Sequence, residues 1–186
     1  MIGLINFYKK EERIEKLKNF IQEESDVVIM DFDSRGQEVD AIFLSGSERL
    51  ITQGDYEDEW FSFVRNSKIP LIGICFGFQL ICRAFGAVIM QGKEIKDLLG
   101  VNKLRDHFLF SGIPNRAKFP ESHQEYVTAV STPLIPLMAS DFCIEAIAHS
   151  SLPVFGTQFH FERSEKYGKK ILKNFLGFTT DLHFLK

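Results

Sequence analysis

One cysteine in this sequence lies in a setting suited to nucleophilic chemistry. Cys75 is the centre of GICFG, with an apolar run before it and the helix-like stretch FGFQLICRAFG after it. Glycines two residues to either side remove the side chains that would collide in a tight strand-to-helix turn. Amides at the start of the following helix would favour a thiolate. The pattern predicts a nucleophile on a sharp turn rather than a buried structural cysteine, whereas Cys82 and Cys143 are expected to pack in the core.

A cysteine nucleophile needs a base, and the best base in this sequence is His160. It lies in VFGTQFHFE, two residues before Glu162. In an extended segment, residues i and i+2 point to the same side, so the carboxylate could receive one imidazole N–H. That contact would fix the tautomer and leave the other ring nitrogen for the thiol. Pairs of this kind are often incidental, so the interpretation depends on the cysteine turn upstream.

Short apolar runs alternate with helical patterns around Cys75, and these elements must position it. Such alternation indicates an α/β fold, an open and mostly parallel sheet with helices on both faces. Strands are expected at 1–7, 26–32, 40–44 and 70–75, and helices at 9–23, 55–66 and 76–86, the last closed by Gly86. Further strands are expected near 87–91, 118–130, 142–148 and 153–160, before a helix at 164–176 with Ser164 as its N-cap. Residues 1–186 are expected to form a single domain.

Composition excludes several classes of function. The chain has 186 residues, 45% of them hydrophobic, and a net charge of −3 without any basic stripe, so no nucleic-acid partner is expected. No apolar run reaches the roughly 18 residues of a membrane span. The start, MIGLINFYKKEER, lacks the charge order of a signal peptide, which favours a cytoplasmic location. Three unpaired cysteines indicate neither a disulfide framework nor a zinc site, so no metal and no cofactor are expected.

Three blocks together resemble the class I, or triad, glutamine amidotransferases. The blocks are IPLIGICFGFQL at 69–80, SHQEYVT at 122–128 and LPVFGTQFHFERS at 152–164. The resemblance implies a flavodoxin-like sheet and a triad of Cys75, His160 and Glu162. It also implies that the side-chain amide of L-glutamine is hydrolysed through a thioester, with the ammonia passing to a synthase subunit or domain.

The same resemblance assigns substrate contacts. Gln79 would help to hold the glutamine, and the segment Ser122-His123-Gln124 would contact its amino-acid end. The backbone N–H of Phe76 follows the nucleophile and would form one half of the oxyanion hole.

The second oxyanion donor would come from the loop after the third strand, through the N–H of Ser47, with Gly46 against the substrate. Many relatives have glycine and proline where this chain has Ser47 and Glu48. They also have proline where this chain has Phe161, and glycine where it has Gln124. These departures leave the subfamily undecided.

Several functions therefore remain open. The synthase served could be GMP synthase, imidazole glycerol phosphate synthase, or anthranilate or aminodeoxychorismate synthase. A γ-glutamyl hydrolase of the same fold would share the triad, although Gln79 argues against it. A non-catalytic regulatory subunit would not need all three triad residues.

Overall fold

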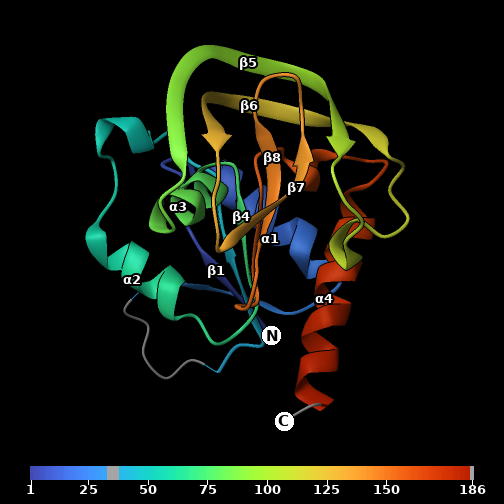
Figure 1. Ribbon diagram of the computed structural model, residues 1–186. Coiled ribbons are helices and arrows are strands. Elements are labelled where there is room, and N and C mark those ends of the chain that lie inside the picture. The colour runs from blue at the N-terminus through green and yellow to red at the C-terminus, as the bar shows by residue number, and fades with distance from the viewer. Residues whose placement is uncertain (33–37, 185–186) are drawn as a thin grey trace.

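A computed structural model describes residues 1–32 and 38–184, with side chains described through residue 180. In this part of the chain nine strands form one sheet, in the order β2-β1-β3-β4-β9-β8-β7-β5-β6 (Figure 1). The strands are β1 (Ile2–Ile5), β2 (Val27–Met30), β3 (Ala41–Leu44), β4 (Leu71–Ile74), β5 (Val88–Lys103), β6 (Arg116–Ala129), β7 (Leu134–Ala139), β8 (Ile144–His149) and β9 (Val154–Thr157). The α-helices are α1 (Glu11–Gln22), α2 (Asp58–Asn66), α3 (Phe76–Ala84) and α4 (Gly168–Phe184), and the 3-10 turns are η1 (Ile51–Gln53), η2 (Phe108–Phe110) and η3 (Phe161–Arg163).

The parallel part of the sheet consists of β2, β1, β3, β4 and β9. Strands β1, β3, β4 and β9 are buried at every residue, because helices cover both of their faces. Their carboxyl ends meet at one edge of the sheet, where ligands bind in open α/β folds.

Helices cover the two faces of this sheet in pairs. Apolar side chains of α1 and α4, such as Leu17 and Phe175, pack in one core cluster. Those of α2 and α3, such as Trp60 and Phe78, pack in a second cluster on the opposite face. Figure 1 shows α2 and α3 on one side of the sheet and α1 and α4 on the other.

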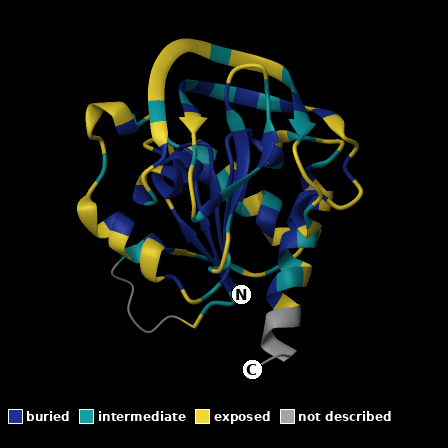
Figure 2. Ribbon diagram, in the orientation of Figure 1, coloured by how far each residue is buried: buried dark blue, intermediate teal, exposed yellow. Residues whose placement is uncertain are grey.

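The remaining strands are antiparallel and extend the sheet beyond β9. The long ribbon of β5 and β6 arches over the end of the sheet where β4 meets α3 (Figure 1). Most residues of β5 are exposed, whereas alternate residues of β6 are buried (Figure 2). Strand β5 therefore acts as an outer cover and β6 as the layer beneath it.

The predicted fold class is confirmed, with four corrections to its elements. Strand β7 was not predicted, and β5 is much longer than the expected strand at 87–91. The last helix begins at Gly168 rather than 164, although the Oγ of Ser164 still accepts a hydrogen bond from the N–H of Tyr167. That helix also extends beyond its predicted end at residue 176, to Phe184. Among the described residues, no helix has both the length and the apolar character to cross a membrane.

Candidate active site

Cys75 occupies the turn between β4 and α3, as predicted. Its φ of 52° and ψ of −102° lie outside the regions that ordinary residues prefer, and it is the one non-glycine residue with a positive φ in the described ranges. Such a conformation costs on the order of 1–3 kcal/mol and persists only where the surroundings impose it. A Cβ on Gly77 would lie 2.5 Å from the carbonyl oxygen of Leu44, and one on Gly73 would collide with the backbone of Gly77. The two glycines thus allow the close packing that holds the turn.

Three segments meet around the buried sulfur. The backbone N–H of Cys75 donates to the carbonyl of Thr157 at 2.8 Å, which ties the turn to the end of β9. Its Sγ lies 3.7 Å from the carbonyl oxygen of Ser122 on β6 and 3.7 Å from the Nε2 of Gln158. The side chain is only 4% exposed, so a substrate must reach it through a defined opening.

The surroundings of the sulfur favour its neutral thiol form. Burial, followed by the negative charges of Glu121 and Glu162, raises the pKa of Cys75 to about 12. The charge of Arg163 and the backbone N–H of Phe76 act in the opposite direction but are outweighed. The backbone N–H at the start of the helix favours the thiolate, as predicted, but burial and the two carboxylates outweigh it.

His160 and Glu162 are paired, although by a different local structure from the one predicted. Strand β9 ends at Thr157, and His160 caps the 3-10 turn η3, so the two residues are not on an extended strand. The Nδ1 of His160 nevertheless lies 2.6 Å from the Oε1 of Glu162, and both side chains are buried. Because a carboxylate can only accept, this ring nitrogen carries the proton and Nε2 is left as an acceptor. Arg163 contacts the same carboxylate oxygen at 3.5 Å.

The loop after β3 lies against the same site. A Cβ on Gly46 would lie 3.2 Å from the Cε1 of His160 and 2.5 Å from the hydroxyl of Tyr8, so a larger residue there would force the side chain of Tyr8 to move. The backbone N–H of Gly77 donates to the carbonyl of Ser45 at 3.1 Å, which ties this loop to the start of α3. The Oγ of Ser45 donates to the carbonyl of Gly46 at 2.9 Å and so holds the peptide plane between residues 46 and 47.

A cavity of about 180 Å³ opens beside Cys75. It is lined by most of the predicted contact residues, namely Ser47, Gln79, Ser122, His123 and Gln124. This volume is below the range typical of drug-sized ligands and suits a smaller molecule.

Two of the predicted contact side chains already have protein partners. The Nε2 of Gln79 donates to the Oε1 of Gln158 at 3.1 Å and lies 3.3 Å from the carbonyl of Glu125. The Nδ1 of His123 lies 2.8 Å from the same carbonyl. These side chains therefore shape the cavity wall through bonds within the protein.

Several residues of the site were not predicted from the sequence. Gln158 contacts the sulfur, and Tyr8 lies beside Gly46. Arg49 lines the cavity with a buried Nε that has no hydrogen-bond partner. Gln158 could have been found from its place in the TQFH stretch, whereas Tyr8 and Arg49 carry no sequence signal.

Comparison with known proteins identifies the family. The family model for glutamine amidotransferase class-I matches residues 5–177. The chain belongs to this family. The amidotransferase is 32% identical to the glutamine-hydrolyzing GMP synthase subunit of Pyrococcus furiosus over 137 residues, which are 72% of each chain. It is also 32% identical to the corresponding GMP synthase subunit of Pyrococcus abyssi over 146 residues, 77% of each chain.

Solved structures share the fold of the amidotransferase. One is a protein of Thermoplasma acidophilum described as a GMP synthase subunit, with a TM-score of 0.87 and 23% identity over 99% of this chain and 96% of that one. The family and these relatives make this chain a glutamine-hydrolysing enzyme, as the sequence predicted.

Proposed function

We propose that this chain is the glutaminase subunit of a GMP synthase and that Cys75, His160 and Glu162 are its catalytic triad. The observation that carries the proposal is the strained turn of Cys75, which is hydrogen-bonded to the end of β9. The buried pair of His160 and Glu162, with 2.6 Å between Nδ1 and Oε1, comes directly after that strand in the chain. The relatives named above support the choice of GMP synthase among the synthases that the sequence left open.

In the proposed reaction the Sγ of Cys75 attacks the side-chain carbonyl carbon of L-glutamine. Nε2 of His160 takes the thiol proton, and Glu162 stabilises the resulting imidazolium. The C–N bond then breaks, His160 returns the proton to the leaving nitrogen, and ammonia departs. Water finally hydrolyses the thioester to glutamate. A thiol whose pKa is about 12 makes the histidine necessary, because almost no thiolate is present near neutral pH.

The oxyanion of each tetrahedral intermediate needs two hydrogen-bond donors. We assign them to the backbone N–H groups of Phe76 and Ser47, the first at the start of α3 and the second in the loop after β3. The bond from Ser45 Oγ to the Gly46 carbonyl supports a loop with a defined peptide orientation. A partner that changes this bond would change the direction of the Ser47 N–H and hence the rate.

Substrate recognition is assigned to the cavity beside Cys75. Ser122, His123 and Gln124 on β6 form one wall, with Gln79 at its base and Gly46 beside the reacting group. The unpartnered Nε of Arg49 suits the substrate carboxylate, since a guanidinium binds a carboxylate strongly. Glu48 and Glu94 also line the cavity and suit the substrate ammonium group.

Glutamine turnover, measured with and without the synthetase partner of a GMP synthase and its acceptor substrate, tests this function. Ammonia release by the chain alone should be slow and should rise when the partner is present. Cys75→Ala should abolish turnover in both conditions. Cys82→Ala is the matched control, because this second buried cysteine only packs in a core cluster, and it should retain turnover.

Two results would contradict the proposal. Full activity of Cys75→Ala would exclude the thioester. A lone chain that already turns over at the rate of the complex would exclude control by the partner and would favour the γ-glutamyl hydrolase.

A further inference from the structure

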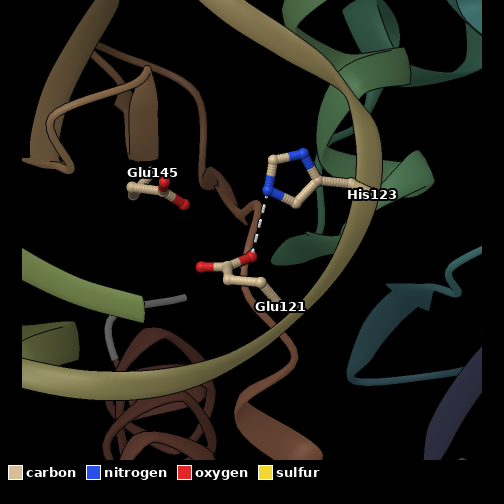
Figure 3. Close-up of side chains that lie close together, drawn as sticks. All are labelled: Glu121, His123 and Glu145. Carbon is tan, nitrogen blue, oxygen red and sulfur yellow. Dashed lines mark ion pairs between the residues drawn. The ribbon is translucent and has the colours of Figure 1, made fainter. Parts of the chain in front are cut away.

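A second cluster of ionisable side chains lies beside the active site. Glu121 and His123 project from β6 and Glu145 from β8, and one ligand atom of each lies within 4.8 Å of the others. Their exposed fractions are 4%, 6% and 0%. Figure 3 shows the two carboxylates and the imidazole directed toward a common point between the two strands. The proposed glutaminase reaction gives Glu121 and Glu145 no role, and it gives His123 only a place in the wall of the substrate cavity.

The hydrogen bonds of His123 leave one ring nitrogen unsatisfied. Its Nδ1 lies 2.8 Å from the backbone carbonyl of Glu125, and because a carbonyl only accepts, Nδ1 carries the proton. In the neutral ring Nε2 is then a bare lone pair. It faces the Oε2 of Glu121 at 3.4 Å, and neither atom has a hydrogen-bond partner among the described residues, so with Glu121 ionised two acceptors point at each other.

The carboxylates of Glu121 and Glu145 also have oxygens that lack hydrogen-bond partners in the described part of the chain. Both side-chain oxygens of Glu121 and the Oε2 of Glu145 are buried without any hydrogen-bond partner. The Oε1 of Glu145 receives a bond from the Sγ of Cys143 at 3.3 Å. A buried polar atom without a partner is costly, and such groups usually bind a partner or a metal.

We propose that Glu121, His123 and Glu145 bind a divalent metal ion of the zinc class. The imidazole is oriented as metal-bound histidines are, with the far N–H donating to a backbone carbonyl. Two carboxylates balance the charge of a divalent cation inside a buried site. An imidazole with two carboxylates favours zinc or a similar transition metal over calcium or magnesium, which prefer oxygen ligands alone.

The spacing of the ligand atoms agrees with such an ion. Zinc–ligand bonds of about 2.0–2.1 Å place neighbouring ligands of a tetrahedron roughly 3.3 Å apart. The 3.4 Å between His123 Nε2 and Glu121 Oε2 matches this edge and is longer than an ordinary hydrogen bond. The ligand atom of Glu145 also lies within 4.8 Å of the other two.

A bound ion would connect β6 to β8 directly behind Ser122, whose carbonyl contacts the sulfur of Cys75. No metal was expected from the sequence, because the cysteines lack zinc spacing. These ligands come instead from two strands that are not hydrogen-bonded neighbours in the sheet.

The test is Zn²⁺ binding by the full chain after treatment with a chelator. Zn²⁺ is titrated in competition with a chromogenic chelator, in the wild type and in Cys75→Ala, because Cys75 and His160 could themselves bind zinc. We expect one equivalent of Zn²⁺ in both proteins. Zn²⁺ at 100 times its Kd should raise Tm by about 5–10 °C. Co²⁺ should give the visible absorption of a low-symmetry site.

Matched variants locate the site. Glu145→Gln keeps the shape of the side chain and should weaken Zn²⁺ binding by more than about tenfold and abolish the rise in Tm. Glu121→Gln should weaken Zn²⁺ binding in the same way, and it replaces Glu145→Gln as the test if Glu145→Gln does not fold. Glu59→Gln, which removes an exposed carboxylate on α2 that lies outside the cavity, should bind Zn²⁺ like the wild type. The proposal is overturned if the wild type binds no Zn²⁺, if Cys75→Ala loses binding, or if both glutamine variants retain it.

Discussion

Replacing Gly77 with alanine tests whether close packing of the cysteine turn sets the rate of glutamine hydrolysis. The new Cβ would lie 2.5 Å from the carbonyl oxygen of Leu44, whereas ordinary contacts begin at 3.4 Å. The first turn of α3 must therefore move away from β3 by about 0.9 Å, and Cys75 two residues earlier must move with it. Overpacking of this kind typically costs about 1–3 kcal/mol of stability.

The larger effect is expected on catalysis. A misplacement near 1 Å costs on the order of 10²-fold in rate, or about 2.7 kcal/mol of transition-state stabilisation. The assay is kcat/KM for glutamine with the synthetase partner present, at a temperature well below the Tm of the variant. Gly177→Ala is the matched control, because nothing lies within 4 Å of its new Cβ and the residue is on α4. A Gly77→Ala enzyme with the kcat/KM of the wild type would refute this reasoning.

Contacts around the cavity lead to two further expectations. Glu125→Ala should lower the free energy of unfolding, measured by urea denaturation, by about 1–3 kcal/mol. The reason is that the Glu125 carboxylate accepts hydrogen bonds from the backbone N–H groups of Ile51 and Thr52, at 2.9 and 2.6 Å. An unchanged urea midpoint would contradict this. Alkylation of Cys75 by iodoacetamide, followed by mass spectrometry without substrate, should accelerate about tenfold per pH unit between pH 7 and 10, because the thiolate fraction grows up to a pKa of about 12. A plateau below pH 9 would show that the resting sulfur is already ionised.

Local patterns in the sequence predicted the parts of the site that local geometry determines. The turn at Cys75 was predictable because Gly73 and Gly77 lie within two residues of it. The His160–Glu162 pair was also predictable, since the two residues are only two positions apart in the chain and their side chains meet although the segment is a 3-10 turn rather than a strand. The chemistry of the sulfur was not predictable, because its raised pKa comes from burial and from Glu121, which is distant in sequence.

The antiparallel half of the sheet was harder to predict. Strand β7 contains Pro136, which is atypical of a strand, and was not recognised. Strand β5 includes QGKEIKD and is exposed along most of its length, so it lacks the apolar alternation that indicates a half-buried strand. The cluster of Glu121, His123 and Glu145 forms only when β6 lies next to β8 in space.

The pairing of β4 with β9 determines when the enzyme can first act during its own synthesis. Leu71 pairs with Val154, so the two strands that precede Cys75 and His160 are 83 residues apart along the chain. At about 5–20 residues per second, the ribosome needs roughly 4–17 s to make that interval. During this time the backbone N–H of Cys75 lacks the Thr157 carbonyl, and the sulfur lacks its proposed base, His160. The nascent chain therefore cannot hydrolyse glutamine until nearly the whole domain has been made, and its long-range parallel pairing favours slow folding.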